Sequence, residues 1–85
     1  MLEVCKESRT SYTWFFNPDT SEFVRLDSNG RAKGIITGSN LPNPMGIKEA
    51  RSKAVAAGRL PQDSRVEADP ITVKLWDFWH AYANN

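Results

Sequence analysis

The chain has one cysteine, Cys5, and one histidine, His80, to supply the thiolate and imidazole groups that many metal sites and active sites use. A zinc site within one chain needs several cysteine, histidine or carboxylate ligands at fixed spacing, and this pair cannot supply them. Asp77 lies three residues before His80, which would bring both side chains to one side of a helix. The simpler interpretation is a surface hydrogen bond together with a favourable charge at the helix C-terminus.

The sequence indicates neither a thiol nucleophile nor a phosphate-binding loop. A catalytic Cys5 would need a base such as His80 beside it, and no spacing places the two together. The stretch 34–39 has two glycines but lacks the lysine and spacing of a phosphate-binding loop, so we interpret it as a strand end and turn. We therefore predict a protein that is not an enzyme, with no catalytic residues, no metal and no small-molecule cofactor.

Length and composition predict one small globular domain over residues 1–85. Hydrophobic residues make up 40% and charged residues 25%, which is typical of a folded domain rather than of disorder. The net charge of +1 gives no overall attraction to nucleic acid or to an anionic membrane. One cysteine cannot form an intrachain disulfide, which fits a reducing compartment or leaves a thiol for another chain. The charged N-terminus and the lack of an apolar run of about 18 residues favour a cytoplasmic protein without a membrane span.

The strongest turn signal is Asn29-Gly30, because both residues tolerate the positive φ angles of a type I′ turn. It predicts a β-hairpin between 23–27 and 31–37. The expected cross-strand pairs are Ser28 with Arg31, Leu26 with Lys33, Val24 with Ile35 and Phe23 with Ile36. Val24, Leu26 and Ile35 would then share one face of the sheet, with Phe23 and Ile36 on the other.

A stretch rich in β-branched and aromatic residues, 11–16, predicts a strand before this hairpin, joined to it by a type I turn at Asn17-Pro18. The sequence does not fix the register of this strand against the strand that follows it. A four-residue loop would put Trp14 opposite Phe23, and a five-residue loop would put it opposite Val24. Because a slip of one residue turns every side chain to the other face, the sequence leaves open whether Trp14 is in the core or on the surface.

Two helices are predicted after the strands, at 44–57 and 70–83. Each begins with an N-cap residue, Asn43 or Asp69, and a proline at the first helical position. The first helix has a mostly alanine stripe, which predicts close packing on the sheet: Ile47, Ala50, Ala54 and Ala57. The second has a larger apolar stripe: Ile71, Leu75, Phe78, Trp79 and Tyr82. Residues 71–75 also alternate, so a strand is the alternative there.

The sequence therefore predicts an α+β fold, a three-stranded antiparallel β-meander packed on one face by two α-helices. Nine aromatic residues (three Trp, two Tyr and four Phe) are many for so small a core, since each buries roughly 150–250 Å². Trp and Tyr are enriched at interface hot spots, so some should face a partner. The expected partner-binding residues are Trp14, Phe23, Trp76, Trp79 and Tyr82. We predict a non-enzymatic protein-binding module that modulates or inhibits a larger partner protein; the partner is another protein or a second copy of this chain.

Basic residues give an alternative prediction, a nucleic-acid-binding regulator that uses the hairpin and the first helix. The expected contacts are Arg25, Arg31, Lys33, Lys48 and Arg51. A three-stranded sheet backed by a helix is used by some DNA-binding modules, whose sheet enters the major groove. Against this, acidic residues interrupt the patch, and edge strands carry Lys and Arg to block aggregation.

Overall fold

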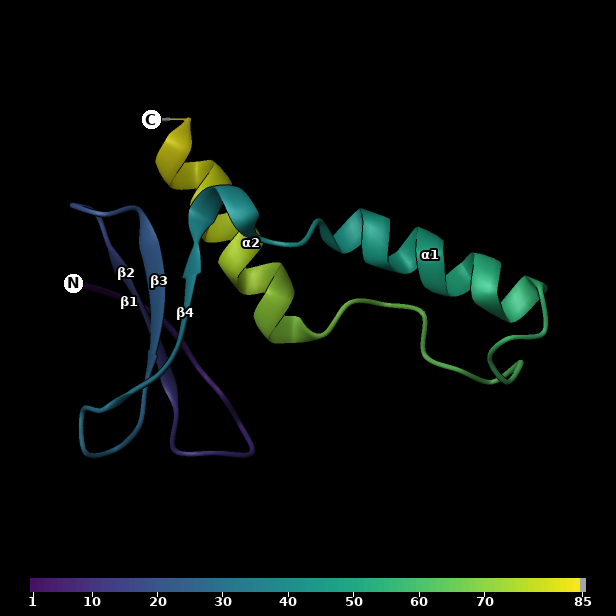
Figure 1. The fold of residues 1–85 in the computed structure, drawn as a ribbon, viewed down its shortest axis with the longest axis horizontal. Coiled ribbons are helices and arrows are strands. Elements are labelled where there is room, and N and C mark those ends of the chain that lie inside the picture. The colour runs from purple at the N-terminus through teal and green to yellow at the C-terminus, as the bar shows by residue number, and fades with distance from the viewer. Residues whose placement is uncertain (85) are drawn as a thin grey trace.

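The computed structural model describes residues 1–84 and shows an α+β fold, a four-stranded antiparallel meander followed by two helices (Figure 1). The strands lie side by side in chain order and are β1 (Leu2–Lys6), β2 (Thr13–Asn17), β3 (Glu22–Leu26) and β4 (Ala32–Thr37). A 3₁₀ helix, η1 (Gly38–Asn40), leads to α1 (Pro44–Ala56), and a long connection leads on to α2 (Pro70–Ala83). The predicted α+β class and the meander are confirmed.

The predicted count of three strands is wrong, because β1 adds a fourth. It pairs with β2, with Leu2 opposite Phe16 and Lys6 opposite Thr13, and its register shifts between Glu3 and Cys5. Leu2, Glu3 and Val4 alternate as in a strand, but the adjacent apolar residues Val4 and Cys5 end the alternation after three residues, too few to mark a strand in sequence. The shift is a β-bulge, the kind of irregularity that locally bends a strand.

The register of β2 against β3 differs from both alternatives considered above, since Trp14 lies opposite Arg25. The connecting loop has four residues, 18–21, and begins one residue later than expected. That delay shifts the pairing by two residues, which keeps Trp14 on the same face as Phe23. The Asn17 Oδ1 atom accepts a hydrogen bond from the backbone N–H of Asp19 at 3.0 Å and helps to fix the start of this loop.

The β3–β4 hairpin has the expected pairs Val24–Ile35 and Phe23–Ile36, but a different turn. A type I′ turn would need a positive φ at both Asn29 and Gly30. Gly30 has a φ of 79°, but the one non-glycine residue with a positive φ in the described chain is Ser21, so Asn29 does not adopt the type I′ conformation. The predicted type I′ turn is therefore wrong.

The observed loop has three residues and is organised by Asp27. Its carbonyl oxygen accepts from the N–H of Gly30 at 3.0 Å, and its N–H donates to the Arg31 carbonyl at 2.9 Å. Its Oδ1 atom accepts from the backbone N–H groups of Asn29 and Arg31, each at 2.9 Å. A bulge next to the loop pairs Leu26 with Ala32, rather than with Lys33 as predicted, and this restores the expected register further along the strands.

The helix α2 covers one face of the sheet with the predicted apolar stripe (Figure 1). Phe16 and Phe23 are fully buried beneath it, with ring centroids 4.8 Å apart. Phe78 packs on both rings, at 5.3 and 5.9 Å, and Tyr82 meets Phe16 edge-on at 4.7 Å. Leu75 and Leu41 complete the buried core. This single aromatic layer holds the helix on the sheet.

The helix α1 does not pack on the sheet as predicted. It extends away from the sheet beyond α2, and none of its residues is buried (Figure 1). Its neighbour is the returning connection, whose Arg59 and Leu60 N–H groups donate to the Ala54 carbonyl at 2.8 and 3.3 Å. The Arg51 guanidinium donates to the Glu67 carbonyl at 2.7 Å. We call α1 and the connection 57–68 the arm.

We predict that Gly38→Ala destabilises the fold by about 1–3 kcal/mol, because of overpacking. A Cβ at Gly38 would overlap the six-membered ring of Trp79, which is packed between η1 and the core. Urea unfolding measures the effect. Gly46→Ala in α1 is the matched control, because its Cβ would find its nearest neighbour at 3.8 Å. Equal urea midpoints for Gly38→Ala and the unmodified chain would contradict this packing.

A second prediction concerns Asp69, the N-cap of α2. Partial burial acts to raise the pKa of its carboxyl, but hydrogen bonds from the N–H and hydroxyl of Thr72, at 3.0 and 2.8 Å, outweigh it and lower the pKa. A lowered pKa gives stability at neutral pH that is lost as the pH falls through the folded-state pKa. Asp69→Asn should therefore be less stable than the unmodified chain at pH 7, with the difference disappearing in strong acid. Thermal unfolding at several pH values tests this, and a pH-independent difference would contradict it.

Candidate functional site

The two faces of the sheet differ in what covers them, and this difference defines the candidate site. Side chains directly opposite one another on neighbouring strands share a face. Phe16, Phe23 and Ile36 form one such row, which α2 covers. Phe15, Val24 and Ile35 form the matching row on the other face, over which no element of residues 1–84 lies. We call this second surface the open face.

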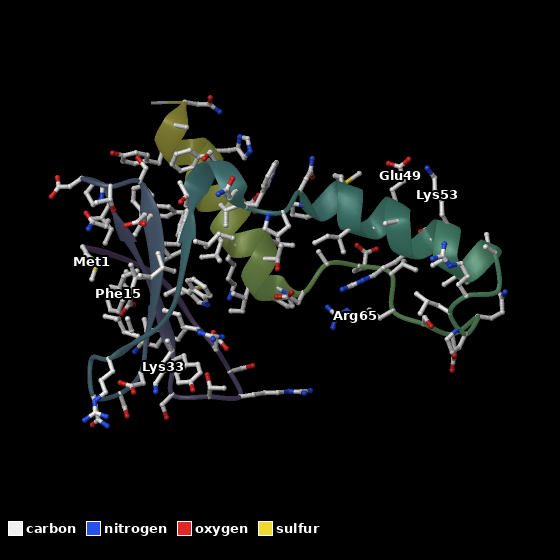
Figure 2. The ribbon with its side chains drawn as sticks, in the orientation of Figure 1. Met1, Phe15, Lys33, Glu49, Lys53 and Arg65 are labelled. Atoms are coloured by element: carbon white, nitrogen blue, oxygen red, sulfur yellow. The ribbon has the colours of Figure 1, made fainter. Side chains whose placement is uncertain are left out.

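The open face is apolar at its centre. Ile35 is 61% exposed, and Phe15 and Val24 are partly exposed beside it. Figure 2 shows Phe15 on the side of the sheet away from α2. Antiparallel sheets with one solvated face usually carry polar residues there. An apolar row at that position is therefore suited to contact with another molecule.

Charged residues flank this row on the open face, acidic ones at one end and a basic one at the other. Glu3 lies opposite Phe15 on β1, so it extends the row at the sheet edge. Glu22 lies opposite Asn17 and Thr37, two residues along the strands from the row. Lys6 lies opposite Thr13 and so is on the same face, at the other end of the strands. A molecule that docks here would therefore match this face best with an apolar centre, basic groups near Glu3 and Glu22, and an acidic group near Lys6.

The five aromatic residues predicted to bind a partner lie instead on the covered face or on α2. Phe23 is fully buried, so it is not available to a partner in this structure. Trp79 is half-buried against the core, and Trp76 is half-buried with its ring 4.3 Å from that of His80. Tyr82 keeps 39% of its surface exposed. These residues form the core and its rim rather than one exposed patch.

Trp14 belongs to a polar cluster on the covered face. Its Nε1–H donates to Glu7 Oε2 at 2.9 Å. Arg25 Nη1 lies 3.6 Å from the same carboxylate oxygen, and the guanidinium carbon lies 4.9 Å from the ring centroid of Tyr12. Arg25 also donates from Nη2 to the Lys33 carbonyl at 3.0 Å. Most of the polar groups in this cluster are thus used within the chain.

A cavity of about 330 Å³ lies between this cluster and the first turns of α2. Its apolar lining is Trp14, Ile36, Leu41, Pro42, Ile71 and Leu75. The carboxylates at its edge, Glu7 and Asp69, already accept hydrogen bonds from the protein. Arg25 and Thr72 also line it, and each contacts one of these carboxylates, Arg25 with Glu7 and Thr72 with Asp69. The cavity can therefore accept a small apolar group, while its polar groups are engaged with one another.

The basic residues predicted for nucleic-acid binding do not form one surface. Arg25 lies in the polar cluster, and Lys33 is 3.9 Å from Asp27 at the end of the hairpin. Lys48 lies on α1, where it pairs with Glu67 at 3.2 Å. The remaining two residues follow the same division, Arg31 at the hairpin and Arg51 on α1. Figure 2 shows the hairpin, marked by Lys33, far from α1, marked by Lys53. Binding to a nucleic-acid backbone favours a continuous basic groove, and these five residues do not form one.

Asp77 and His80 both lie on the exposed side of α2, and His80 packs against Trp76. No group of three or more metal-ligating side chains comes together within residues 1–84. In the same part of the chain, no helix has the length and apolar character needed to cross a membrane.

Comparisons of the chain with protein-family models, with curated protein sequences and with solved structures found no match. The function must therefore be inferred from the surfaces themselves.

Sequence reasoning missed Phe15 as a site residue, although a signal for it is present. Three strands carry adjacent apolar pairs: Phe15-Phe16, Phe23-Val24 and Ile35-Ile36. Because neighbours along a strand point to opposite faces, such pairs in register give a sheet that is apolar on both sides. The unresolved register of β2 hid this match, since it left the face of Phe15 undecided.

We predict that Cys5 reacts slowly with thiol reagents in the folded chain. Burial raises the pKa of its thiol, an effect only partly opposed by the positive charge of Lys74, and the thiolate is the reactive form. The rate of reaction with a colorimetric disulfide reagent at pH 7 should be lower for the folded chain than for the chain in urea. Equal or faster reaction in the folded state would contradict the burial and would reopen the case for a nucleophile.

Proposed function

We propose that this chain is a small, non-enzymatic protein-binding module of the cytoplasm, which acts by docking its open face on a partner protein. The observation that carries the proposal is the apolar row Phe15–Val24–Ile35, in register across three strands and uncovered. Burying apolar surface is the main driving force of protein association, at about 25 cal/mol per Å². An exposed row of this kind is therefore better explained by a partner than by solvent.

The rigidity of the sheet supports the proposal. Two of the three strands that carry the row also hold the buried Phe16–Phe23 pair, so the geometry of the row is fixed before a partner binds. Preorganised contact residues lose little conformational entropy on binding, which leaves more of the apolar contribution as affinity. The charges around the row, Glu3 and Glu22 at one end and Lys6 at the other, would select partners with opposite charges around an apolar centre.

Substitution of Ile35 by glutamate tests the proposal. We expect Ile35→Glu to weaken partner capture about 30-fold, because a charge buried in a contact of this kind costs about 2 kcal/mol or more. The unmodified and variant chains, each immobilised, are compared by quantitative mass spectrometry of proteins retained from an extract of the source organism. Ser39→Glu, on exposed η1, adds the same charge outside the open face and should leave capture unchanged.

Two outcomes would contradict the proposal. One is the same set of proteins retained by Ile35→Glu and by the unmodified chain. The other is retention of nucleic acid that falls steeply with added salt and is insensitive to Ile35→Glu, since counterion release is the mark of phosphate-backbone binding. Circular dichroism of each variant confirms that the fold is intact.

A further inference from the structure

The arm carries a surface that complements the open face in shape. A shallow hollow of about 640 Å³ runs along α1 and the start of the returning connection. Its floor is made of small or aliphatic residues, Ala50, Ala54, Ala57 and Leu60. Small residues on a helix allow bulky side chains of a second element to approach its backbone closely, as ridges pack into grooves. The protruding side chains of the open face, Phe15 and Ile35, are suited to such a hollow.

The two surfaces also complement each other in charge. Lys53 and Arg59 line the hollow on the arm, and Glu3 and Glu22 lie at one end of the open face. Lys6 lies at the other end of that face, and the arm carries the acidic Glu49 beside Lys53. Lys53 pairs with Glu49 at 3.3 Å, but both side chains are largely exposed, so this contact contributes little and is readily exchanged. The arm therefore offers an apolar centre, two basic residues for the acidic end of the open face and one acidic residue for Lys6.

The arm cannot reach the open face of its own chain in this fold. It leaves the molecule on the side of α2, while the open face is on the opposite side of the sheet (Figures 1 and 2). A contact between the two surfaces therefore has to join two molecules. Its two halves belong to one sequence, so a second copy of the chain can supply both.

We propose that the partner of the open face is a second copy of this chain, with α1 of each protomer packed on the open face of the other. The inference rests on the proposed function and names the partner that it leaves open. A twofold arrangement makes the contact twice, because each protomer gives one arm and receives one. Each sheet then lies between two helical layers, α2 of its own chain and α1 of its partner. The exchange also supports α1, since a helix of 13 residues without a buried face is marginal in water.

Crosslinking tests this arrangement directly. Two variants are made in a Cys5→Ser background, one with Ile35→Cys on the open face and one with Ala54→Cys in the hollow. A short bismaleimide reagent should link the mixed variants into dimers of one chain of each kind. A mixture of Ser39→Cys with Ala54→Cys is the matched control and should give little product, because Ser39 lies on η1 outside the open face.

Light scattering of the full chain gives the second measurement. The unmodified chain should form dimers, and both Ile35→Glu and Ala54→Arg should raise the dimer dissociation constant about 30-fold or more. Ala81→Arg, at an exposed position of α2, is the control and should remain dimeric. Ala54→Arg adds bulk and charge to the hollow, so loss of dimer in both variants implicates both surfaces.

Several outcomes would overturn the inference. Crosslinking of Ile35→Cys to itself, rather than to Ala54→Cys, would show two sheets packed face to face. A monomer at all concentrations, or a dimer unaffected by both variants, would also exclude the exchange of arms. These failures differ from failure of the proposed function, because a monomer that loses other proteins through Ile35→Glu would still be a binding module with a different partner.

Discussion

The pairing of Phe16 with Phe23 is the constraint on which the rest of the structure depends. The two rings lie directly opposite each other on β2 and β3, fully buried under α2. Side chains alternate between the faces of a strand, so this one pair decides the face of every other residue on both strands. It directs Trp14 and Arg25 under the helix and Phe15 and Val24 to the opposite side. The open face follows from the core.

The sequence was sufficient for the elements whose signals are local. N-caps followed by proline placed both helices within a residue or two, and the stripe of α2 identified its buried side correctly. The pairs Val24–Ile35 and Phe23–Ile36 were also found, although through the wrong turn. The turn failed because the side chain of Asp27 binds two backbone N–H groups and stabilises a three-residue loop. A bulge next to this loop then restored the predicted pairs further along the strands.

The rest could not be predicted because it depends on contacts between distant segments. β1 has no clear pattern of its own, and its strand conformation depends on pairing with β2. The amphipathic pattern of α1 shows that the helix has an apolar side but not which surface meets it. The candidate site was missed for the same reason. The aromatic surplus was counted correctly, yet most of it forms one layer with Phe16 and Phe23, and the exposed apolar row depends on a register that the sequence left open.

We propose that another protein molecule covers the open face. Carbene footprinting of side chains tests it most directly, by comparing the dilute purified chain with the chain inside cells of its source. Phe15 and Ile35 should be labelled strongly in the dilute chain and clearly protected in cells, with the labelling of Tyr82 unchanged. Equal labelling of Phe15 and Ile35 in both settings would contradict it, because the face would then be exposed to solvent where the protein acts.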